Sequence, residues 1–231
     1  MKPVWSPMRV LAFACIALFS VAAFAAKKPP QEWDGLTLVK LKGVDAAYVR
    51  PGADFAIYNK IIIDPIQVAF AKEWDKRGAI SNQKISAEKL DEIKTKMGKL
   101  AEETFAEVFS KDNGPQIVTA PGPDVLRFSS AIVDLWPRAV DTQEPGRNYT
   151  YTTSAGSAVL YAELRDSETN QLIGRVVDGR EARNSGTMRW TNSVENTAEA
   201  RAMIQDWARI LRKRYDAIKE GAGAAAAAGA Q

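Results

Sequence analysis

Four aspartates stand at predicted strand ends or turns, and their carboxyl groups are the side chains best suited to acid–base chemistry: Asp64, Asp134, Asp166 and Asp178. Two carboxylates that converge in a cleft at roughly 5–9.5 Å could hydrolyse a glycan, and several could bind a hard cation. Their spacing gives no sign of such convergence, and aspartate is also a common turn residue. We therefore predict structural roles for all four and keep a carboxylate-based hydrolase acting on cell-wall glycan as the alternative function.

The remaining composition removes most other catalytic arrangements. The chain of 231 residues has no histidine and a single cysteine, Cys15. Histidine is the commonest general base and metal ligand, so its absence excludes Ser-His and Cys-His nucleophilic pairs and zinc sites of the His/Cys type. We expect no metal and no cofactor, and the composition favours a protein that is not an enzyme. A formal net charge of +3 also predicts no nucleic-acid partner.

The first 25 residues have the organisation of a secretion signal. A short charged segment precedes the apolar run Val10 to Ala22, and Ala23-Phe24-Ala25 is a small-x-small cleavage site. An uncleaved anchor would need about 20 apolar residues, and this run is shorter. We predict cleavage between Ala25 and Ala26, and a periplasmic or secreted mature chain without a transmembrane segment. Cys15 lies in the middle of the run without a lipobox, so we do not expect it to carry lipid.

Aromatic and arginine side chains near an aperiodic segment form the candidate binding surface. The segment Pro137 to Thr153 has no apolar periodicity, and long loops of this kind in compact domains are often functional. Aromatic residues and arginine dominate interface hot spots. The expected binding residues are therefore Trp136, Arg138, Tyr149, Tyr151 and Trp190. The alternative is that the two tryptophans only cover the open end of the core.

The final predicted helix carries a second candidate surface, made of cations. These residues are Arg209, Arg212, Lys213, Arg214 and Lys219. They could meet anionic lipid or lipopolysaccharide. Cations late in a helix more often complement its dipole and stay solvated, which is our prediction here.

Two helices and a sheet must position these residues. Apolar residues recur at helical spacing from Ser86 to Lys111, with Ser86 as N-cap, and from Asn196 to Lys219. Alternating segments predict strands, including Val125 to Leu135 and a hairpin with its turn at Asp166 to Asn170. The fold class is therefore α/β of the α+β two-layer type, with a mostly antiparallel or mixed sheet of about five strands and two long helices packed on it.

The stretch "IYNKIIIDPIQVAF", Ile57 to Phe70, predicts a strand interrupted by Asp64-Pro65. Ile61 to Ile63 are consecutive β-branched residues, which is typical of a strand buried on both faces. Proline cannot donate to the ladder and belongs at an edge or a bulge. We predict that a central strand becomes an edge strand or bends out of the sheet here. We also expect Asp64 to accept a hydrogen bond from the backbone freed at this point.

Several ordered segments of the chain resemble the bacterial family catalogued as domain of unknown function 3313. They are "RPGADFAIYNKIIIDPIQVAF", "LRFSSAIVDLWP", "SAGSAVLYAELRDSETNQLIGRVVDGR" and the final helix with Trp207. The resemblance covers about Tyr48 to Leu211 and implies an envelope lipoprotein or a secreted protein. It implies no activity or catalytic residue, and this chain lacks the lipobox.

These observations give one domain and one preferred function. We expect a signal peptide at 1–25, a polar leader at 26–45, a single α/β domain at 46–220 and a low-complexity disordered tail at 221–231. The predicted function is a non-enzymatic binding or assembly-auxiliary domain of the cell envelope. Its partner would be an envelope protein or another envelope component.

Overall fold

The structure is a computed structural model, and it describes residues 28–72, 74, 86–137, 150–152, 156–181, 189–191 and 193–229. The chain divides into two units, Met1–Pro30 and Gln31–Gln231. All helices and strands of the described residues belong to the second unit. The predicted cleavage site at Ala25 and Ala26 lies outside the described residues.

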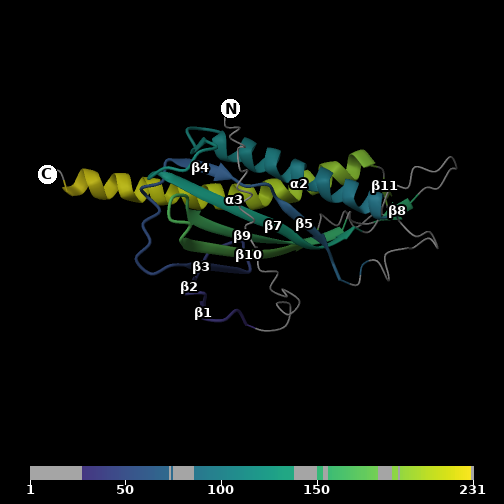
Figure 1. Cartoon of the computed structure of the whole chain (residues 1–231), viewed down its shortest axis with the longest axis horizontal. Helices are drawn as coiled ribbons and strands as arrows, with labels where there is room; N and C mark the ends of the chain where they lie inside the picture. The colour runs from purple at the N-terminus through teal and green to yellow at the C-terminus, as the bar shows by residue number, and fades with distance from the viewer. Residues whose placement is uncertain are drawn as a thin grey trace, which may run out of the picture. The chain divides into compact units, whose positions relative to one another are not determined.

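Nine strands form one mixed sheet in the order β1-β2-β3-β10-β9-β7-β4-β6, and β5 also pairs with β7 (Figure 1). Their bounds are β1 Glu32–Trp33, β2 Leu36–Val39, β3 Ala46–Val49, β4 Lys60–Ile63, β5 Gln67–Phe70, β6 Gln116–Ile117, β7 Val125–Pro137, β9 Gly156–Asp166 and β10 Leu172–Glu181. The pairs from β1 to β7 along this order are antiparallel, whereas β4 and β5 run parallel to β7. The α+β fold class is confirmed, but the sheet has nine strands rather than about five.

Most of the additional strands are short. β1 and β2 fall in the segment expected to be a polar leader, and they form a hairpin in which Trp33 pairs with Leu36. Asp34 and Gly35 form its turn, both with positive φ (53° and 74°). An Asp-Gly pair is a strong hairpin signal, but two flanking strands of two and four residues are too short to show an alternating pattern.

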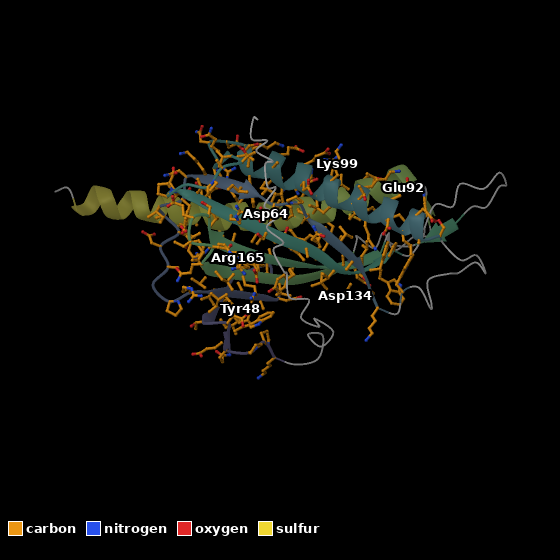
Figure 2. All side chains as sticks on the ribbon, viewed as in Figure 1. Tyr48, Asp64, Glu92, Lys99, Asp134 and Arg165 are labelled. Carbon is orange, nitrogen blue, oxygen red and sulfur yellow. The ribbon has the colours of Figure 1, made fainter. Side chains whose placement is uncertain are left out.

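Two helices, α2 (Ala87–Ser110) and α3 (Ser193–Gly229), pack on the sheet and on each other (Figure 1). Ser86 caps α2 as predicted, because its side chain accepts a hydrogen bond from the backbone N–H of Lys89 at 3.2 Å. Figure 2 shows Glu92 and Lys99 on the outer side of α2, away from the sheet. The left-handed residues after α2 are Asp112 and Asn113.

The helix α3 is longer at both ends than the predicted range of Asn196 to Lys219. It begins at Ser193, so Asn196 lies inside the helix and is not its cap. It also continues through Gly229, where the sequence predicted a disordered tail. Alanine has the highest helix propensity of all residues, and the run of alanines after Gly223 therefore favours continuation of the helix.

The core lies between the helices and one face of the sheet. Successive strand residues point to opposite faces, and the even-numbered residues of β7 and β9, such as Phe128, Ile132 and Leu160, belong to the main buried cluster. Trp207 of α3 is in the same cluster with 1% of its surface exposed. Trp207 is therefore a core residue.

The break at Asp64-Pro65 separates β4 from β5. The two strands pair with successive parts of β7. β4 lies between β7 and β6, whereas β5 pairs with β7 alone among the described strands. The predicted change from central to edge strand is therefore confirmed. The helix covers the break, because Glu102 of α2 accepts the backbone N–H of Ile66 at 2.9 Å.

Candidate functional site

The four aspartates lie in separate places. The carboxylate of Asp64 binds Arg127 Nη1 at 2.9 Å and the Ser129 hydroxyl, two side chains rather than the freed backbone that we expected. Asp166 accepts from the backbone N–H of Thr169 at 2.8 Å in the β9–β10 turn. Backbone and side-chain hydrogen bonds from Thr169 lower the pKa of Asp166, which keeps it ionised and is the opposite of what a general acid needs.

The other two aspartates occupy a buried position and an exposed one. Asp178 is 4% exposed and accepts the indole N–H of Trp207 at 2.8 Å. Asp134 is exposed in a bulge of β7 with φ 49°. Figure 2 shows Asp64 and Asp134 well apart, and the described residues contain no group of three potential metal ligands. The contacts of Asp64, Asp166 and Asp178 are those of structural residues.

The predicted aromatic surface falls partly outside the described residues. Arg138 and Tyr149 are not described. Tyr151 lies in β8 (Thr150–Thr152) and Trp190 in β11 (Arg189–Thr191), and the two are direct partners in a separate two-stranded antiparallel sheet. Thr150–Thr152 is thus a strand and not part of a loop, consistent with the strand preference of threonine and tyrosine.

Trp136 lies at the end of β7 and is half-buried. The strand end is held by Trp74, whose indole N–H donates to the carbonyl of Pro137 at 2.9 Å. Of the five expected binding residues, Tyr151 and Trp190 are brought together by the pairing of their strands. A binding role for the five residues remains a prediction.

A different site is a cavity of about 330 Å³ between the sheet and the part of α3 from Leu211 to Ile218. Ala47 of β3 and Val176 of β10 line its floor; they are register partners and both are buried. Leu211, Tyr215 and Ile218 of α3 line the opposite wall and are half-buried. The lining is mainly apolar, which is the usual character of a small-molecule site.

Small residues on the sheet keep this space open. Gly174 of β10 lies between the side chains of Leu164 and Phe55, and a Cβ added there would come within 3.3 Å of each. Ala47, Ala53 and Ala162 also line the cavity. The lining comes from both helices, six strands and three connecting loops, so no local pattern in the sequence could have shown it.

Charged residues gather at the cavity on the side of α3. Lys40, in the connection from β2 to β3, and Arg214 are both exposed and line it, together with Asp54. Among the described residues neither cation has an ion-pair or hydrogen-bond partner. Asp54 accepts the backbone N–H of Ala56 at 2.8 Å.

Two further arginines line the cavity but have other partners. Arg212 donates to the carbonyls of Phe109 and Asp112 at 3.0 Å each, and so caps the C-terminal end of α2. The expectation that these cations complement the dipole of their own helix is therefore wrong for Arg212. Arg175 is 3% exposed and binds Glu163 and Asp34 at 2.8 Å each.

Lys219 is also engaged, because its ammonium group donates to the carbonyl of Ala56 and to the side chain of Asn59. Burial lowers the pKa of Lys219. Burial also raises the pKa of Tyr215, so its hydroxyl stays protonated and donates to the carbonyl of Tyr58 at 3.2 Å. Among the described residues that line the cavity, no nucleophile is paired with a base.

Comparison with protein families gives one match over most of the chain. Residues 32–211 match the sequence profile of the family described as protein of unknown function (DUF3313). The chain belongs to this family. The match begins at the β1–β2 hairpin and ends in α3 beside the cavity, so the DUF3313 domain includes most of the residues that form the cavity.

Among solved structures, similar chains include the PelC dodecamer from Paraburkholderia phytofirmans (13% identity, TM-score 0.36, covering 70% of this chain and 92% of that one). A minor lipoprotein from Acinetobacter baumannii gives 9% identity and a TM-score of 0.30, covering 70% of this chain and 94% of that one. A neuraminyllactose-binding hemagglutinin homolog from Helicobacter pylori gives 11% identity and a TM-score of 0.32, covering 71% and 90%. Likenesses at this level carry no argument about function. Comparison with curated proteins gives no match.

The described part of the DUF3313 chain has no helix that is both long enough and apolar enough to span a membrane. The long helix α3 instead carries charged residues along most of its length, among them Arg209, Lys213 and Arg214.

Proposed function

We propose that this DUF3313 protein is a non-enzymatic binding domain of the bacterial cell envelope, and that its ligand occupies the cavity between α3 and the sheet. The observation that carries the proposal is the apolar cavity of about 330 Å³. Pockets of about 300–1,000 Å³ lined mostly by apolar groups are typical small-molecule sites. The lack of histidine and the separate structural partners of the aspartates favour binding over catalysis.

A cavity-filling variant tests this use of the space. Ala47→Leu places a larger side chain into the cavity, so we expect the variant to melt at or above the wild-type temperature. It should lose binding of an apolar fluorescent probe such as 1-aminoanthracene, measured by fluorescence titration of the purified mature chain. Unchanged probe binding would contradict the proposed site.

The neighbouring alanine provides a matched control. Ala46 is in the same strand but belongs to the small buried cluster with Leu36, Tyr48 and Leu172. Adjacent strand residues face opposite sides, so Ala46→Leu overpacks that cluster and should cost about 1–3 kcal/mol of stability. Probe affinity should be retained below its melting temperature. The pair therefore separates loss of the cavity from a general effect of a larger side chain in β3.

Location in the envelope rests on the signal-like first 25 residues. Mass spectrometry of the protein recovered from its native host should show an N-terminus at Ala26 or within one residue of it. An intact Met1, or a diacylated N-terminus at Cys15, would overturn the proposed export and processing.

A second candidate function is the binding of an envelope partner through the aromatic surface. The supporting observation is that Tyr151 and Trp190 are direct partners in the β8–β11 sheet. Replacing Tyr149 and Tyr151 by serine should leave the urea melt nearly unchanged and weaken capture of a partner from envelope extract by at least about 2 kcal/mol. If the double variant unfolds, these tyrosines have a role in the core instead.

A further inference from the structure

We infer that the cavity binds a single-chain anionic amphiphile, with the hydrocarbon chain between α3 and the sheet and the acidic head group at Lys40 and Arg214. The inference rests on the proposed function and names the class of ligand. Fatty acids, whether free or released from envelope lipids, share this chemistry.

The size and lining of the cavity indicate a ligand with a single hydrocarbon chain. A volume of about 330 Å³ is at the small end of the usual range for ligand pockets, which suits one slim chain better than a two-chain lipid. Val176, Leu211 and Ile218 line it, and these groups offer a hydrocarbon chain dispersion contacts without a polar requirement. A sugar would leave its hydroxyl groups without partners on such walls.

The charged residues that line the cavity indicate the charge of the ligand's head group. Of the four cations that line the cavity, Arg175 and Arg212 have structural partners, whereas Lys40 and Arg214 have none among the described residues. The single anion there is Asp54, which already accepts a hydrogen bond from the backbone of Ala56. Two cations without partners against one carboxylate leave a net positive charge at the cavity, which favours an anion over a cation or a neutral group.

A close contact fixes the loop with Lys40 against the helix with Arg214. A Cβ added to Gly43, which follows Lys40 by three residues and has φ +90°, would lie 3.1 Å from Cδ1 of Ile210. Ile210 and Arg214 are one helical turn apart and share a face of α3. The contact therefore holds the β2–β3 connection beside the same face of α3 that presents Arg214. Val39, 37% exposed, adds an apolar side chain to the cavity wall next to Lys40.

Binding of dodecanoate and dodecanol tests the assignment, because the two share a chain and differ in the charge of the head group. We expect calorimetric titration below the micelle-forming concentration to show tighter binding of dodecanoate by the wild-type chain. The double variant Lys40→Gln/Arg214→Gln should weaken dodecanoate binding by about three- to tenfold, as two exposed ion pairs would. Dodecanol binding should be unchanged, and added salt should reduce the preference.

The chain offers a matched control for charge. Lys42 and Lys213 are exposed cations next to the two residues in question and do not line the cavity. The double variant Lys42→Gln/Lys213→Gln changes the net charge equally and should bind dodecanoate like the wild type. An equal loss in both double variants would mean that general charge attracts the anion, and would overturn the assigned head-group site.

The remaining outcomes separate this inference from the proposed function. Equal affinity of the wild type for dodecanoate and dodecanol would overturn the anionic head group and leave a binding cavity in place. If neither amphiphile nor the apolar probe binds, the proposed function fails as well. Binding to phosphatidylglycerol vesicles without binding of free dodecanoate would overturn the single-chain ligand in favour of a membrane surface.

Discussion

The helix α3 packs on the sheet in two different ways along the part from Met203 to Ile218. In the first half, Met203, Ile204, Trp207 and Ala208 are all at most 8% exposed and belong to the main core. In the second half, Leu211, Tyr215 and Ile218 are half-buried and line a cavity. The apolar stripe of the helix continues through both halves, so the helix pattern alone does not explain the difference.

This difference in packing arises from the size of the side chains that α3 and the sheet bring into contact. The indole of Trp207 fills the space over the sheet in the first half and also satisfies the buried carboxylate of Asp178. In the second half the sheet offers Ala47 and Gly174, and the helix offers no tryptophan to fill the space above them. One half of the contact therefore supplies stability, and the other half leaves the cavity in which we propose that a ligand binds.

The largest expected effect belongs to the packed half. Trp207→Ala removes a large side chain from the core and leaves Asp178 without its indole donor, so it should cost about 3–5 kcal/mol in urea melts. Trp207→Phe keeps most of the volume and should cost less. A change below about 0.5 kcal/mol for the alanine variant would mean that the two halves do not differ as described.

The second effect concerns Glu163 and Arg175, whose side chains alternate along β9 and β10 with those of Ala162 and Val176 and so point to the other face of the sheet. Burial alone would raise the pKa of Glu163, but hydrogen bonds from Arg175, Arg165 and Tyr161 outweigh it and lower the pKa. A carboxyl group with a lowered folded-state pKa contributes stability above its unfolded value, and this contribution disappears as the pH falls through the folded-state pKa. Glu163 thus stabilises the protein at neutral pH.

Glu163→Gln should therefore reduce stability at about pH 7, by less than the roughly 3–5 kcal/mol seen when a buried pair is broken, because Asp34 still pairs with Arg175. Urea melts of the two proteins should converge as the pH is lowered through the folded-state pKa of Glu163, which lies below the ordinary value of a glutamate. Probe binding in the cavity should not change. A gap in stability that is equally large above and below that pKa would contradict the assigned role of the carboxylate.

Arg212 lies at the junction of the two halves and gives the third effect. Arg212→Gln removes charged hydrogen bonds to the carbonyl of Phe109 in α2 and to that of Asp112 just after it and should cost about 1.5–3 kcal/mol. Hydrogen exchange should rise in the final turn of α2, up to Ser110. Lys213→Gln is the control and should change stability by less than about 0.5 kcal/mol.

Ile218→Ala probes the open half and should cost much less than Trp207→Ala. Ile218 is half-buried over a cavity, so few packing contacts are lost, and we expect less than about 1.5 kcal/mol in urea melts. The same variant should weaken binding of the apolar probe, because Ile218 lines the cavity. A loss of stability equal to that of Trp207→Ala would show that the second half of the helix is core.

The sequence predicted the elements whose signal is local. The capped start of α2, the long strand β7, the break at Asp64-Pro65 and the hairpin turn at Asp166 to Asn170 all depend on a few adjacent residues. Propensity and turn chemistry act over that range. The short strands β1 and β6 were missed because two residues carry no periodicity.

The candidate site could not be predicted in the same way. Its floor joins Ala47 to Val176 across more than half of the chain, and each is an ordinary strand residue in its own segment. The cap on α2 comes from Arg212, about 100 residues after the carbonyls that it binds. The sheet order, with β3 beside β10, brings Ala47 and Val176 together, and the packing of α3 on α2 brings Arg212 to its carbonyls. No single segment encodes either arrangement.

The smallest expected effect concerns the end of α3, beyond both halves. A Cβ added to Gly221 would meet no atom of another element within 4 Å, so the helix is open on that side at Gly221. Deleting residues 223–231 should therefore change the free energy of unfolding by less than about 0.5 kcal/mol in urea melts, while circular dichroism shows a small loss of helix. Deleting 216–231 also removes Ile218 and Lys219 and should lower both stability and probe binding. If the shorter deletion already lowers either quantity as much as the longer one, the end of α3 takes part in the site.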